Sequence, residues 1–114
     1  MLSEIPADGV RSVNVTLSNI MYKALLIRRG NVVQFVYNSN TYNTAAGELG
    51  TVGTIPEGFR PTTDLQFNNN GNGANPYMNF HIYPNGNVTA YNYGSAIIGA
   101  AACRFNAMWI TADD

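Results

Sequence analysis

Charged side chains are scarce in this sequence. Asp, Glu, Lys and Arg together make up 11% of its 114 residues, whereas an average soluble domain contains about 25%. The six basic residues are scattered from Arg11 to Arg104, and the formal net charge is -1. A protein that binds nucleic acid needs several basic residues on one surface to neutralise phosphates. We therefore expect no nucleic-acid partner.

The side chains that most enzymes use are also few. The sequence contains one histidine, His81, and one cysteine, Cys103. Its carboxylates are Glu4, Asp8, Glu48, Glu57, Asp64, Asp113 and Asp114. Catalysis requires titratable groups that converge on a substrate, and a metal site requires three or four donors; no spacing here predicts either. We expect no enzyme, no catalytic residue, no metal site and no cofactor.

Long apolar segments and a second cysteine are missing as well. One cysteine excludes an internal disulfide, and Cys103 follows three alanines, which indicates a buried structural thiol. The longest apolar stretch, residues 96–103, is far shorter than the roughly twenty residues that span a bilayer, so we expect no membrane insertion. Residues 1–11 are typical of a linker or an N-terminal extension, and we expect residues 12–114 to form a single domain, a β-sandwich by its strand pattern.

The sequence is rich in residues that favour turns and β-strands. Asn and Gly, which favour turns, are frequent, and so are Tyr and Phe, which favour strands. Strand-like runs bounded by Gly, Asn or Pro cover residues 12–17, 24–29, 32–42, 64–67, 77–83, 88–93 and 103–111. Short strands joined by turns predict an all-β fold, either an antiparallel β-sandwich or a barrel.

The first predicted hairpin turns at Gly30 and Asn31. Glycine at the first position suits a two-residue loop, which pairs residues 25–27 with residues 34–36. Both faces of this hairpin are mainly apolar, so both must be covered, by a second sheet or by a neighbouring subunit. The pattern alone therefore predicts oligomerisation.

The second predicted hairpin turns at the sequence Tyr-Pro-Asn-Gly, residues 83–86. Pro and Gly stand where a type I turn followed by a glycine bulge requires them, which predicts a three-residue loop. In that register Ile82 faces Val88 and Phe80 faces Ala90. One face of the hairpin is then core, formed by Met78, Phe80, Ile82, Val88 and Ala90.

The opposite face of this hairpin carries aromatic and amide side chains. They are Tyr77, Asn79, His81, Thr89, Tyr91 and Tyr93. Such side chains stack on sugar rings and hydrogen-bond sugar hydroxyls, so we take Tyr77, Asn79, His81, Tyr91 and Tyr93 as candidate ligand-binding residues. The alternative is that the same face packs beneath a loop or against another subunit. A two-residue loop would instead turn Tyr91 and Tyr93 toward the core.

Two turn motifs carry a family resemblance that covers roughly residues 24–111. The sequences Gly-Thr-Ile-Pro-Glu-Gly-Phe-Arg-Pro, residues 53–61, and Ile-Tyr-Pro-Asn-Gly-Asn-Val, residues 82–88, occur in that order. They resemble the C-terminal receptor-binding head domains of tail-fibre and baseplate proteins from phages of Gram-positive bacteria. In the first motif, Gly58 is suited to a positive φ and Phe59 to a place in the core.

The resemblance implies an antiparallel β-sandwich head of jelly-roll type that forms a homotrimer. It also implies binding of a bacterial cell-wall or cell-surface saccharide, a place at the phage tail tip in the virion, and attachment to the rest of the tail or baseplate through the N-terminus. Two other functions stay open. The chain is alternatively a purely structural trimerisation module of a phage tail or baseplate, or a carbohydrate-binding module of a secreted bacterial enzyme.

Overall fold

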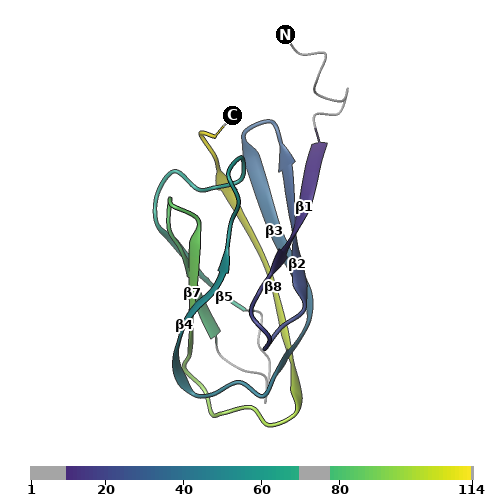
Figure 1. Cartoon of the computed structure of the whole chain (residues 1–114), viewed down its shortest axis with the longest axis vertical. Helices are drawn as coiled ribbons and strands as arrows, with labels where there is room; N and C mark the ends of the chain where they lie inside the picture. The colour runs from purple at the N-terminus through teal and green to yellow at the C-terminus, as the bar shows by residue number, and fades with distance from the viewer. Residues whose placement is uncertain (1–9, 70–77, 114) are drawn as a thin grey trace.

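Two antiparallel β-sheets make up the computed structural model of the chain, which describes residues 10–69 and 78–113 (Figure 1). Sheet A contains, in spatial order, β1 (Val10–Thr16), β2 (Lys23–Arg29), β3 (Val32–Tyr42) and β8 (Ala100–Ile110). Sheet B contains β4 (Gly47–Thr54), β7 (Asn87–Asn92), β6 (Met78–Ile82) and β5 (Leu65–Asn68). The described residues form no helix that is long and apolar enough to cross a membrane.

The all-β prediction is confirmed, and each predicted strand-like run overlaps one strand. The strand that the sequence analysis missed is β4, which contains three glycines. It also shifts its register against β7 twice, between Glu48 and Gly50 and between Thr51 and Gly53. Glycine is depleted in strands and bulges interrupt the alternation of side chains, so β4 lacks the usual sequence pattern. Most of the expected linker, residues 1–11, lies outside the described residues.

The order of strands in sheet B is a Greek key. Strands β5, β6 and β7 follow one another as neighbours, and β4 lies beside β7. Sheet A is a meander of β1, β2 and β3 to which the last strand, β8, is added beside β3. The two sheets form a sandwich-like fold. The jelly-roll type, which has two Greek keys, and the homotrimer stay predictions.

The edges of the two sheets meet where β4 passes the end of β1. A Cβ atom on Gly53 would lie 2.9 Å from Leu17 Cδ2 and 3.0 Å from the carbonyl oxygen of Thr16. Only glycine permits the backbones to come this close. The absence of a side chain at Gly53 therefore lets sheet B close against sheet A along one side.

The core lies between the sheets and is rich in aromatic rings. Phe105 of sheet A contacts Phe67 and Phe80 of sheet B, with ring centroids 5.0 Å and 4.8 Å apart. Phe35 joins the same cluster, and its ring centroid is 5.1 Å from that of Phe105. Aromatic pairs of this kind contribute roughly 0.5–1.5 kcal/mol each beyond the burial of their surface. Cys103 is also fully buried, as expected.

The first hairpin has the predicted register. Arg29 pairs with Val32 across a two-residue loop, and Leu26 pairs with Phe35. Gly30 has a φ of 60°, a left-handed conformation that suits glycine at the first loop position. The inner face of the hairpin is buried, since Leu26, Val33 and Phe35 have no exposed surface.

The second hairpin, β6–β7, also has the predicted register. Ile82 pairs with Val88, Phe80 with Ala90, and Met78 with Asn92. The Gly86 N–H donates to the Tyr83 carbonyl at 2.8 Å, and Gly86 has a φ of 94°. The inward-facing residues Met78, Phe80, Ile82, Val88 and Ala90 are all buried. The alternate residues of both strands therefore form the outer face of sheet B.

The turn motif of residues 55–61 is tied to both sheets. On the sheet A side, Trp109 Nε1 donates to the Phe59 carbonyl at 2.7 Å and Arg28 Nη1 donates to the Gly58 carbonyl at 2.6 Å. On the sheet B side, the Ile55 N–H donates to the Gly86 carbonyl at 2.7 Å. Gly58 has a φ of 95° and Phe59 is buried, as the sequence predicts.

Candidate functional site

Four of the five candidate residues lie together on the outer face of sheet B. Asn79 and His81 come from β6, where they pair with Tyr91 and Thr89 of β7. Tyr93 follows the end of β7. These side chains point outward because side chains alternate along a strand and their neighbours in sequence are buried in the core. The fifth candidate residue, Tyr77, lies outside the described residues.

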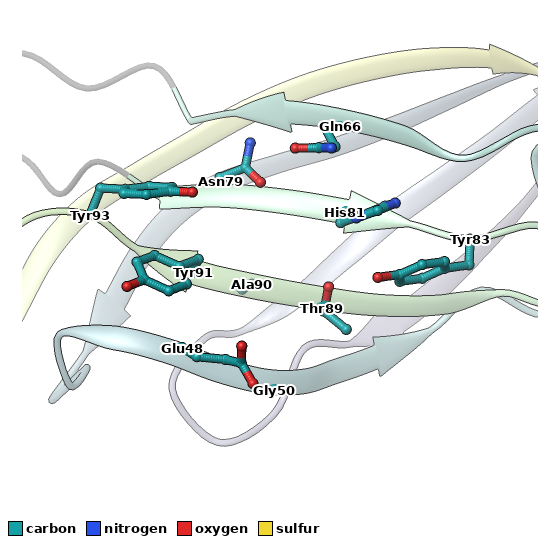
Figure 2. Close-up of a pocket in the computed structure, with 10 residues that line it drawn as sticks. All are labelled: Glu48, Gly50, Gln66, Asn79, His81, Tyr83, Thr89, Ala90, Tyr91 and Tyr93. Atoms are coloured by element: carbon teal, nitrogen blue, oxygen red, sulfur yellow. The ribbon is translucent and has the colours of Figure 1, made fainter.

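A shallow groove of about 360 Å³ runs across this face (Figure 2). Its lining residues are Glu48, Gly50, Gln66, Asn79, His81, Tyr83, Thr89, Ala90, Tyr91 and Tyr93. They come from all four strands of sheet B and from the residues directly after β6 and β7. We call this surface the sheet B groove.

Aromatic pairs mark the two ends of the sheet B groove (Figure 2). At one end, the rings of Tyr91 and Tyr93 have centroids 4.4 Å apart, and the two residues are 38% and 69% exposed. At the other end, the rings of His81 and Tyr83 stack at 4.0 Å with an angle of 16° between their planes. Between the pairs the groove is lined by the short side chain of Thr89 and by Ala90, whose side chain faces the core.

Polar side chains line the two long sides of the groove. Gln66 and Asn79 lie along one side, and Glu48 lies along the other (Figure 2). Asn79 Nδ2 donates to Asn68 Oδ1 at 3.0 Å, which fixes the orientation of the Asn79 amide. Glu48 pairs across the strands with Tyr91 and is exposed. The groove thus offers amide and hydroxyl groups and one carboxylate beside its aromatic ends.

His81 has an acidic neighbour. Its Nε2 atom lies 3.5 Å from Asp64 Oδ2, which is a distance for an ion pair when the ring is protonated. The side chain of His81 is 24% exposed and that of Asp64 is 59% exposed. Tyr83 stacks on the face of the His81 ring, and Asp64 lies near its edge, although Nε2 makes no hydrogen bond to any described residue. Among residues 10–69 and 78–113, no group of three or more His, Cys, Asp or Glu could hold a metal ion.

Sequence reasoning missed Glu48, Gln66 and Tyr83 as lining residues. Glu48 was missed because β4 was not predicted as a strand. Gln66 lies in a predicted strand, but its pairing with His81 across β5 and β6 is a contact between distant parts of the sequence. Tyr83 was assigned to the turn; its spacing of two residues from His81 was the signal that could have placed it on the same face.

A second feature lies on the outer face of sheet A, where a group of apolar side chains surrounds Gln34. Its exposed members are Leu25, Val32, Met108 and Ile110, which are 36%, 39%, 64% and 56% exposed. Together with Ile27 and Val36 they form what we call the apolar outer face. Both faces of the first hairpin were expected to be covered; sheet B covers the inner face, and no described residue covers the outer one.

Comparison with known proteins does not assign the chain to a family. No protein-family model matches the sequence, and no curated protein matches it. The resemblance to phage head domains therefore rests on the two turn motifs, residues 53–61 and 82–88. Function has to be inferred from the sheet B groove and from the apolar outer face.

Proposed function

We propose that this chain is a receptor-binding head domain of a phage tail fibre or baseplate and that it binds a saccharide of the bacterial surface in the sheet B groove. The observation that carries the proposal is the presence of two aromatic pairs, Tyr91 with Tyr93 and His81 with Tyr83, at the ends of a groove whose long sides carry polar side chains. The C–H faces of a sugar ring pack on aromatic rings, while its hydroxyls need hydrogen-bond partners at the ring edge. The groove supplies both kinds of contact.

The dimensions of the groove suit such a ligand. Its volume of about 360 Å³ is near the lower end of small-molecule sites, which range over roughly 300–1,000 Å³. The hydroxyl of Thr89 and the amides of Gln66 and Asn79 are uncharged donors and acceptors, so they hydrogen-bond hydroxyls without a need to neutralise charge. An open groove also accepts one or two units of a polymer without requiring a free chain end.

Replacement of Tyr91 by alanine tests this proposal. We expect Tyr91→Ala to weaken glycan binding about tenfold, because an exposed stacking surface at the end of the groove is lost. Binding is measured by calorimetry with a saccharide selected from a bacterial glycan array. Tyr22→Ala is the matched control, since Tyr22 is 60% exposed and does not line the groove. Equal affinities of the two variants would contradict the proposal.

The proposed head acts as a homotrimer, and the apolar outer face supports this part of the proposal. Exposed Val32 and Ile110 lie directly opposite each other on the neighbouring strands β3 and β8, and exposed Met108 lies two residues before Ile110 on β8, opposite Gln34. Large exposed apolar patches are uncommon on monomers.

The strand order supports the fold type of the proposed head. The two-sheet fold and the Greek key of sheet B support a jelly-roll-like head, which we propose is attached through its N-terminus to the rest of the tail.

The apolar outer face also favours the second candidate function, a trimerisation module that binds no ligand. The two functions differ in which face the assembly buries. A binding head keeps the sheet B groove open and buries the apolar outer face, whereas a purely structural module has no need of an open groove. Binding by the intact oligomer therefore distinguishes them. A carbohydrate-binding module of a secreted enzyme would bind as a monomer.

A further inference from the structure

Positive charge is absent from the strands that form the sheet B groove. The six Lys and Arg residues of the chain are Arg11, Lys23, Arg28, Arg29, Arg60 and Arg104. Five of them lie on β1, β2 or β8 of sheet A, and Arg60 lies in the turn of residues 55–61. None lines the groove. A ligand in the groove consequently meets no Lys or Arg side chain.

Two of the arginines already have structural partners. Arg28 is 6% exposed, and its guanidinium donates to the carbonyls of Gly30 and Gly58. Arg60 Nε donates to the Ile55 carbonyl at 3.3 Å. These side chains hold turns at the end of the sandwich. They are therefore not available to neutralise an anion on the outer face of sheet B.

Negative charge is present in the groove, at Glu48. This residue is exposed on β4 and lies across from Tyr91, so its carboxylate stands beside an aromatic end of the groove. His81 is the lining side chain that becomes positive on protonation, but Asp64 lies 3.5 Å from its Nε2 atom and balances that charge. The groove thus combines uncharged polar groups with one carboxylate.

Building on the proposed function, we infer that the sheet B groove selects an uncharged saccharide, and that Glu48 is a binding and specificity-determining residue in it. The Glu48 carboxylate accepts hydrogen bonds from two hydroxyls of the sugar stacked on Tyr91, and hydrogen bonds to a charged acceptor are stronger than neutral ones. A phosphodiester or uronate group in the same place meets the carboxylate with like charge and no compensating cation. The groove therefore disfavours anionic wall polymers.

The test compares three classes of glycan on one array. Neutral bacterial oligosaccharides, the same kinds of oligosaccharide bearing glycerol phosphate, and uronate-containing oligosaccharides are probed with the full chain at about 50 mM and about 500 mM salt. We expect binding to neutral probes only, with a signal that changes less than about twofold between the two salt concentrations. Preferential, salt-sensitive binding of phosphate- or uronate-bearing probes would overturn the inference and leave the proposed function standing. Binding of no probe would overturn both.

The role of Glu48 has its own variants. Glu48→Gln keeps the size of the side chain and removes the charge, so we expect it to weaken binding of a neutral probe about tenfold, as loss of a charge-assisted acceptor does. Glu57→Gln is the matched control, since Glu57 is an exposed carboxylate in the turn of residues 55–61, outside the groove. Unchanged affinity of Glu48→Gln, with Tyr91→Ala still impaired, would overturn the role of Glu48 alone.

Discussion

Cys103 shows how burial changes the chemistry of one side chain. The residue has no exposed surface, and its Sγ atom lies 3.8 Å from Met78 Sδ between the two sheets. Desolvation raises the pKa of the Cys103 thiol from 9.0 to about 12, because a thiolate would lose its hydration in the core. At physiological pH the side chain is therefore a neutral packing group and a poor nucleophile.

The pKa of Cys103 makes stability depend on alkaline pH. Above pH 9 the unfolded chain releases the thiol proton, while the folded chain keeps it until about pH 12. The free energy of unfolding must fall as pH rises through this window, by up to about 1.4 kcal/mol per pH unit. We expect Cys103→Ala to show a shallower fall in denaturant titrations between pH 8 and pH 11.

The difference between the two proteins reports mainly on the ionisation of the Cys103 thiol. Burial also raises the pKa of Tyr37, and that tyrosine acts in the same direction at alkaline pH. Tyr37 is present in the wild type and in Cys103→Ala alike, so its contribution cancels in the difference except for the smaller part of its pKa shift that comes from charge on Cys103. If the free energy of unfolding fell with pH equally in the wild type and in Cys103→Ala, the thiol would ionise as readily in the folded chain as in the unfolded one.

At the scale of single residues, the sequence predicted inward and outward positions of the second hairpin well. Pro84 and Gly86 specify the turn, the turn specifies the register, and the register places His81 and Tyr91 on the outer face. Glu48 could not be placed in the same way. Its position beside Tyr91 depends on the pairing of β4 with β7, and no local pattern encodes that pairing.

At the scale of elements, the turn of the β6–β7 hairpin also supports the turn of residues 55–61. A Cβ atom on Gly86 would lie 2.4 Å from the Ile55 carbonyl oxygen, in a backbone conformation with a φ of 94°. We expect Gly86→Ala to lower the free energy of unfolding by at least about 2 kcal/mol, because strain and a clash with backbone add together. Chemical denaturation measures this loss.

Gly30→Ala provides the control for this substitution. Gly30 also has a positive φ, 60°, but a Cβ atom there would meet nothing within 4 Å. Its replacement should therefore cost only the conformational strain, about 1 kcal/mol. If the two variants lost the same free energy of unfolding, the close approach of Gly86 to Ile55 would contribute nothing to stability.

Hairpins were predictable from the sequence and the sheet order was not. The two-residue turn at Gly30 and the glycine bulge at Gly86 are local signals, and both hairpins have the registers they specify. The neighbours β3 and β8, and likewise β4 and β7, are joined by packing of residues far apart in the chain. Local propensity carries no information on such pairs. The side of the groove that β4 and Glu48 form was therefore not predicted.

At the scale of the whole molecule, the two outer faces differ in character. Sheet A presents apolar side chains with Lys23, Arg29 and Arg104 exposed among them, whereas sheet B presents aromatic and uncharged polar side chains with Glu48. An apolar face is best removed from water by another protein surface, and a polar groove is best left open for a ligand. In the proposed head, one outer face would therefore serve assembly and the other recognition.

This separation predicts the effect of a charge on the apolar outer face. Light scattering should give the purified protein a mass of three times the 12.4 kDa chain, and Met108→Glu should shift it toward the monomer because a buried carboxylate is costly. Ile98→Glu is the control, since Ile98 is 93% exposed between β7 and β8. A monomeric wild type would contradict the homotrimer.

The meeting of β1 and β4 has a consequence for aggregation. Strands at the edge of a sheet can template the addition of strands from other molecules. On this side of the sandwich the register shifts of β4 interrupt its hydrogen-bonding edge, and the approach of Gly53 to Thr16 and Leu17 sets the two edges against each other. We therefore expect the close approach at Gly53 to make this side of the molecule a poor template for added strands.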